Sequence, residues 1–81
     1  MSDLITVESR FEKNGTVHPK AFEWKGRHYT VESVGRQWEE DGILHILVMV
    51  ASEVFEISFT SSSMSWHLVR SPQDFGTHRA A

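Results

Sequence analysis

The stretch that decides the fold is Ile43-Leu44-His45-Ile46-Leu47-Val48-Met49-Val50-Ala51, which is apolar almost throughout. Side chains alternate between the two sides of a strand, and here both alternating sets are apolar, interrupted only by His45. The stretch begins directly after a glycine and is rich in isoleucine and valine, which favours a strand; a buried helix is the competing interpretation. A strand that is apolar on both sides is usually covered on both sides. The stretch therefore predicts the central strand of a sheet.

Two more strands are predicted downstream of this stretch. Residues 52–60 alternate cleanly between apolar and polar side chains, which is typical of a half-buried strand. Residues 66–70 form the last predicted strand, which the following Ser-Pro pair ends because proline cannot donate to a sheet. The residues after it are mostly small and polar. We therefore predict a single β domain over residues 1–72 and a flexible C-terminal tail over residues 73–81.

Upstream, the sequence predicts two hairpins and one irregular segment. Residues 4–11 alternate with the period of a strand, and the Asn-Gly pair at 14–15 is the strongest hairpin signal in the chain. A second hairpin is predicted within residues 20–34, with its two-residue turn at Lys25-Gly26. The polar segment 35–42 is interpreted as a loop or as one helical turn.

These elements together predict a mainly β domain, an antiparallel meander of five or six strands with at most one short helical turn. A flat sheet of that size would leave one face wet and two edges open. The strand that is apolar on both sides instead predicts a strongly curled sheet or a small partial barrel. Alternatively, the second apolar side of that strand is covered by the segment around Trp38 or by another chain.

Length, composition and charge limit the function classes. The 81 residues suit one domain, and the absence of cysteine excludes disulfides, thiol nucleophiles and sulfur-based zinc sites. Because no secretory signal or membrane-spanning run is visible, we expect a cytoplasmic protein that does not enter a membrane. The net charge of −3 disfavours a general phosphate-binding surface. However, residues 10–30 carry five basic and two acidic side chains and residues 31–60 one basic and six acidic, an asymmetry that can orient a partner or a second copy.

The second predicted hairpin carries a candidate contact site. Its two-residue turn would pair Trp24 with Arg27 and bring the guanidinium near the indole ring. Trp24 and Tyr29 offer rings on which bases of single-stranded nucleic acid could stack, while Lys25 and Arg27 offer cations for phosphates. The competing interpretation is a small core that fills its few positions with large rings.

A row of polar side chains suggests a candidate metal site. If residues 51–52 form a two-residue turn, His45 lies opposite Ser58, and Ser58 lies opposite His67 on the next strand. Glu56 would then lie diagonally from both histidines. Two histidines and one carboxylate are suitable ligands for zinc or another transition metal. Ordinary surface or hydrogen-bonded histidines are the competing interpretation, and we predict no cofactor.

The hairpin and the last strand also carry a family resemblance. The run Trp24-Lys25-Gly26-Arg27-His28-Tyr29-Thr30-Val31, with Trp38 and the closing Trp66-His67-Leu68, resembles a family of small bacterial domains of unknown function. The similarity covers roughly residues 18–70. Because such domains occur beside or fused to translesion-polymerase-like proteins, the resemblance implies an accessory role in DNA repair. It carries over no catalytic residue.

The sequence favours binding over catalysis. The serines lack a nucleophile motif, and the glycines are not spaced as a phosphate loop. Residues 53–60 are β-prone and would recruit another strand if they lay at a sheet edge. We therefore predict a non-enzymatic interaction or accessory module with a protein partner, or with a second copy in a homodimer. The alternative is a weak single-stranded nucleic-acid-binding domain linked to DNA repair.

Overall fold

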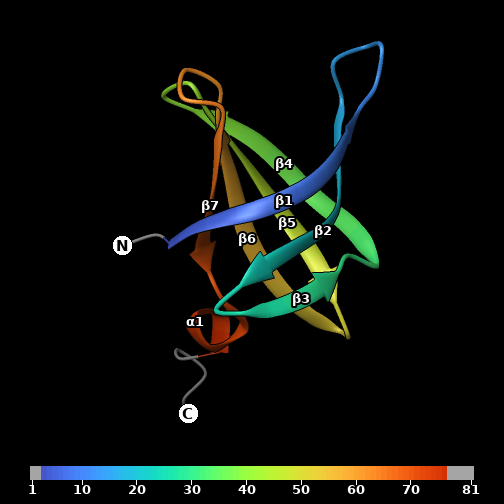
Figure 1. Cartoon of the computed structure of the whole chain (residues 1–81), viewed down its shortest axis with the longest axis vertical. Coiled ribbons are helices and arrows are strands. Elements are labelled where there is room, and N and C mark those ends of the chain that lie inside the picture. The colour runs from blue at the N-terminus through green and yellow to red at the C-terminus, as the bar shows by residue number, and fades with distance from the viewer. Residues whose placement is uncertain (1–2, 77–81) are drawn as a thin grey trace.

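The computed structural model describes residues 3–76, which form seven strands and one short helix (Figure 1). The predicted five or six strands were too few, because the segment interpreted as a loop or helical turn at 35–42 forms most of an additional strand and the turn after it. The elements are β1 (Asp3–Phe11), β2 (Val17–Trp24), β3 (Arg27–Thr30), β4 (Ser33–Glu40), β5 (Ile43–Val50), β6 (Glu53–Thr60), β7 (Ser65–Arg70) and α1 (Pro72–Gly76).

The strands form one curled antiparallel sheet in the order β3-β2-β1-β7-β6-β5-β4. Strand β1 joins its two halves, because residues 3–5 pair with β7 while residues 6–11 pair with β2. The sheet therefore folds over, and β1, β2 and β3 cross in front of β4, β5 and β6 (Figure 1). The predictions of a mainly β meander, a strongly curled sheet and at most one short helical element are confirmed, but the helix lies at Pro72–Gly76 and not within residues 35–42.

Strand β5 lies beside the edge strand β4, so the prediction that it is central was wrong; the middle strand of the order is β7. On the inner side of β5, Ile46 and Val48 are completely buried in the core. The outer side, which includes Leu47 and Met49, is half-buried. No second layer covers that side among the described residues, and neighbouring side chains shield it in part. We expected both sides of β5 to be covered, but only the side that faces the inside of the curled sheet is fully buried.

Three of the hairpins turn through two residues that both have positive φ. This is the signature of type I′ turns, whose twist matches that of the flanking strands. The pairs are Lys25 (52°) with Gly26 (76°), Asp41 (55°) with Gly42 (79°), and Ala51 (51°) with Ser52 (68°). Only the first two contain glycine at the second position, so the third turn carries the least favourable residues for its conformation.

The two edge strands are β3 and β4, and β6 is an interior strand. Residues 53–60 therefore do not offer the free edge that would recruit another strand. The free edges are also short or irregular: β3 has four residues, and the pairing of β4 is interrupted between Val34 and Gln37. The Gln37 side chain donates from Nε2 to the Val17 carbonyl of β2 over 3.3 Å, and so links the two layers. Such edges disfavour strand addition.

Helix α1 occupies the first part of the predicted tail, while residues 77–81 lie outside the described residues. The Asp74 carboxylate accepts a hydrogen bond from the Ser71 N–H over 2.7 Å, which caps the helix at its start. The helix packs against β6 and β7. Within residues 3–76, no helix has the length and hydropathy needed to cross a membrane.

Candidate functional site

An aromatic cleft of about 240 Å³ lies where the β2–β3 hairpin, the start of β6 and the start of α1 meet. Figure 1 shows the β2–β3 turn beside α1 at this end of the molecule. We call this site the aromatic cleft. Its lining residues are Trp24, Arg27, Tyr29, Glu53, Phe55, Ser71, Pro72 and Gln73.

The rings of the cleft support one another from three strands. Tyr29 of β3 stacks on the buried Phe22 of β2, with ring centroids 5.0 Å apart and planes at 12°. Phe55 of β6 packs at an angle against Tyr29, at 5.3 Å, and edge-on against Trp24, at 6.2 Å. Such offset and edge-on arrangements are favourable for aromatic pairs. The cleft wall is therefore part of the core and has a defined shape before any ligand binds.

The indole of Trp24 is held on two sides. Its Nε1 donates to Asp3 Oδ2 over 2.9 Å, and the Lys25 ammonium lies 4.9 Å from the ring centroid. The predicted pairing of Trp24 with Arg27 is confirmed, but the cation recorded over the indole is Lys25 and not Arg27. In the part of the chain that the structure describes, no hydrogen bond or ion pair engages the side chains of Arg27 or Glu53. Both charged groups are therefore available to a ligand.

The structure brings together three of the four residues proposed for the contact site. Trp24, Arg27 and Tyr29 line the cleft, and Lys25 lies over the Trp24 ring. Sequence reasoning missed the opposite wall, which comes from the beginning of β6 and from α1. Its only sequence signal was the inward position of Phe55 in the alternation of residues 52–60. The residues that were missed are Glu53, Phe55, Ser71, Pro72 and Gln73.

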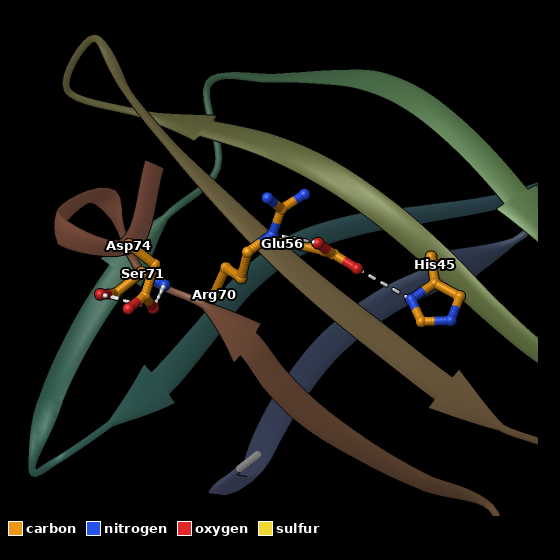
Figure 2. Close-up of polar contacts among 5 residues, drawn as sticks. All are labelled: His45, Glu56, Arg70, Ser71 and Asp74. Carbon is orange, nitrogen blue, oxygen red and sulfur yellow. Dashed lines mark hydrogen bonds and ion pairs between the residues drawn. The ribbon is translucent and has the colours of Figure 1, made fainter. Parts of the chain in front are cut away.

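A second feature, a group of polar side chains, lies on the outer face of the sheet (Figure 2). The Glu56 side chain is only 5 % exposed, and its two oxygens are bound on either side. Arg70 Nε donates to Oε1 over 2.7 Å, and His45 Nδ1 lies 2.9 Å from Oε2. The Trp38 ring stacks on His45 with centroids 5.3 Å apart. A carboxylate this deeply buried requires such partners, so we treat His45, Glu56 and Arg70 as one network.

The network includes two of the three proposed metal ligands. The predicted row of His45, Ser58 and His67 across three strands is confirmed by the strand pairing. However, the second oxygen of Glu56 binds Arg70, and His67 does not take part. Within residues 3–76, no group of three or more His, Cys, Asp or Glu residues is placed to hold a metal ion. The arrangement links β5, β6 and β7 through hydrogen bonds.

The network also contacts α1, which contributes to one wall of the aromatic cleft. Arg70 directly precedes Ser71 and Pro72, which line the cleft. The Arg70 guanidinium carbon lies 4.2 Å from the centroid of the Phe75 ring in α1. Arg70 therefore contacts β6 through Glu56 and α1 through Phe75. We infer that the network positions α1 against the sheet.

A larger depression of about 540 Å³ lies between β2 and the β3–β4 corner. Its lining contains no phenylalanine, tyrosine or tryptophan, and five of its eight residues are polar or charged. Its charged side chains, Lys20 and Glu32, are exposed, and no network supports them. The aromatic cleft is smaller but has both a preformed apolar surface and available charges, so we consider it the better candidate site.

The fold and the cleft define a class of small, curled antiparallel β domains with an aromatic cleft at one end. A family model described as Domain of unknown function (DUF6504) matches residues 1–46, and the chain belongs to this family. The resemblance to a family of unknown function is confirmed at this level. No curated protein and no solved structure matches the chain. The matched residues include Trp24, Arg27 and Tyr29 but not the opposite wall of the cleft.

Proposed function

We propose that this domain is a non-enzymatic interaction module that binds a short segment of a partner protein in the aromatic cleft. The observation that carries the proposal is the convergence of Trp24, Tyr29 and Phe55 with Pro72 in one cleft. Aromatic rings are preferred anchors at protein interfaces because they provide a large apolar area at little entropic cost. The free charges of Arg27 and Glu53 at the same site would give the contact its orientation.

The size of the cleft supports a short segment over a cofactor. Small-molecule sites usually measure ~300–1,000 Å³, whereas this cleft measures about 240 Å³. One or two side chains of a partner would fill it. The lining contains no histidine, and its serine, Ser71, donates to Asp74 within the helix cap over 3.3 Å. These features favour binding over acid–base or nucleophilic catalysis.

Site-specific cross-linking tests this proposal. A photoreactive amino acid at Gln73, an exposed residue of the cleft wall, is expected to capture a discrete protein from a cell lysate. The same group at Met64, which is 71 % exposed in the β6–β7 loop at the opposite end of β6, is the matched control.

The cross-link at Gln73 should weaken several-fold when Tyr29→Ala removes one ring of the cleft. The circular dichroism of the variant must show that it remains folded. A cross-link that survives Tyr29→Ala, or that appears equally from Met64, would contradict the proposal.

A second candidate is weak binding of single-stranded nucleic acid at the same hairpin. It is favoured by Lys25 over the Trp24 ring and by Arg27 in the cleft wall. The role in DNA repair implied by the family resemblance would fit such binding. However, Tyr29 stacks on Phe22 and the Lys25 ammonium lies over the Trp24 ring, so each ring has one face occupied. The Glu53 carboxylate in the same lining would also repel a phosphate. Titration with oligothymidine at low salt, monitored by tryptophan fluorescence, should show quenching if this candidate is correct.

A homodimer is the form of the proposal in which the partner segment comes from a second copy. The split between basic and acidic regions of the chain supports this form. Light scattering measures it directly, because a dimer doubles the apparent mass. A monomeric mass at all concentrations would contradict the homodimer form of the proposal.

A further inference from the structure

We infer that the segment bound in the aromatic cleft contains proline in the polyproline II conformation and carries a basic residue that faces Glu53. This inference rests on the proposed function and names the chemistry of its partner. Polyproline II segments dock in grooves lined by aromatic side chains, because their rings and preset backbone lose little entropy on binding. Trp24, Tyr29 and Phe55 line such a groove here, with Pro72 beside them.

The free hydrogen-bond donors of the cleft suit a ligand that mainly accepts hydrogen bonds. The Arg27 guanidinium, the Tyr29 hydroxyl and the Gln73 amide are donors, and within residues 3–76 no hydrogen bond engages these three groups. A polyproline II segment has no internal hydrogen bonds, so its carbonyl groups need donors. Proline also lacks an N–H, so it leaves no donor unpaired against the rings. The acceptors of the lining, which include the Glu53 carboxylate and the Gln73 amide oxygen, remain available to a basic side chain of the segment.

The charges of the cleft fix the second feature of the ligand. Glu53 is the acidic side chain of the lining, it is exposed, and no cation pairs with it in the described part of the chain. Glu53 and Arg27 leave the lining close to neutral overall. A polyanion would be attracted by Arg27 but repelled by Glu53, whereas a neutral proline segment with one lysine or arginine would pair with Glu53 and leave Arg27 to the carbonyl groups of the segment. Charge complementarity therefore favours a basic, proline-containing peptide over nucleic acid.

A peptide titration followed by amide NMR tests the inference. The probe is a blocked peptide with the repeat Pro-Pro-Ala three times and one terminal arginine. We expect amide shifts at Arg27 and Gln73 and a measurable Kd. Replacing every proline by alanine should weaken binding at least ten-fold. Tyr29→Phe, which removes only the hydroxyl, should weaken it about two- to ten-fold.

A charge exchange tests the basic residue separately. Glu53→Lys should weaken binding of the arginine peptide about two- to five-fold, the range of an exposed ion pair. The same variant should bind a peptide with glutamate in place of arginine more tightly than the wild type does. Glu40→Lys, the same change at an exposed position of β4 outside the cleft, is the matched control and should leave both affinities unchanged.

The results separate this inference from the function on which it rests. If the proline peptide causes no shifts at the cleft while the Gln73 cross-link still depends on Tyr29, the inference is wrong and the interaction module stands. If neither is observed, both fail. Equal binding of the proline and alanine peptides also overturns the inference, as does tighter binding of oligothymidine at the same amides.

Discussion

Glu56→Gln changes one atom in the network of His45, Glu56 and Arg70 and should lower the free energy of unfolding substantially. Glu56 is 5 % exposed and binds Arg70 through one oxygen and His45 through the other. The glutamine amide retains a single acceptor oxygen and loses the negative charge. Its oxygen can accept from Arg70, but its N–H then faces His45 Nδ1, which can accept only when the imidazole proton is on Nε2. The substitution therefore removes the charge from the contact with Arg70 and forces one tautomer on His45, without opening a cavity.

The magnitude follows from the burial and from the partners. Hydrogen bonds to charged groups contribute ~1.5–3 kcal/mol. Arg70 is 46 % exposed and can recover part of its loss from water, so we expect the lower half of that range, about 1.5–2 kcal/mol. A domain of this size has a free energy of unfolding of roughly 4–12 kcal/mol. The change corresponds to a fall in melting temperature of roughly 6–16 °C.

Urea unfolding monitored by tryptophan fluorescence measures the effect. The matched control is Glu53→Gln, the same chemical change three positions earlier on β6, at an exposed side chain. We expect this control to alter the free energy of unfolding by less than ~0.5 kcal/mol. If Glu56→Gln costs no more than Glu53→Gln, the network does not stabilise the fold, and our account of how α1 is held is wrong.

The turns and the histidine row give further tests by the same unfolding measurement. Replacing Ala51 by asparagine together with Ser52 by glycine should stabilise the domain by about 1–2 kcal/mol, because both positions have positive φ; no gain would exclude the type I′ turn. Gly42→Ala should destabilise the domain by about 1 kcal/mol, because Gly42 has a φ of 79°. Gly35→Ala should be nearly neutral, since its Cβ would lie 3.6 Å from the nearest atom. Equal losses in the two variants would refute the assigned turn. His67→Ala should change stability by less than ~0.5 kcal/mol, and a loss above 1 kcal/mol would place His67 in the network.

The hairpins could be predicted because their signals are local. The Lys25-Gly26 turn gave the pairing of Trp24 with Arg27, and the assumed two-residue turn at 51–52 gave the register of β5 with β6. Strand β4 was missed because it is a polar edge strand whose alternation is interrupted. Between Val34 and Gln37 the pairing with β5 shifts, so the side chains do not keep the period of a regular strand.

The candidate site could be predicted only in part, because an irregularity in strand pairing again hides the signal. A second irregularity, beside Glu56 in the pairing of β6 with β7, places Arg70 directly opposite Glu56. Regular alternation from His67 would place Arg70 on the inner face instead. The sequence therefore indicated a histidine row but not the cation that binds the buried carboxylate. The far wall of the cleft depends on packing between segments distant in the chain, for which no local signal exists.

The network and the cleft share one element, and this links stability to binding. A helix of five residues is too short to be stable alone, so α1 depends on its Ser71–Asp74 cap and on the contact between Arg70 and Phe75. Because Arg70 is in turn fixed by Glu56, weakening the network should loosen the wall that carries Pro72 and Gln73. A partner that packs against that wall would stabilise α1, and by linkage would raise the stability of the whole domain. Glu56→Gln should therefore lower affinity at a cleft that it does not touch.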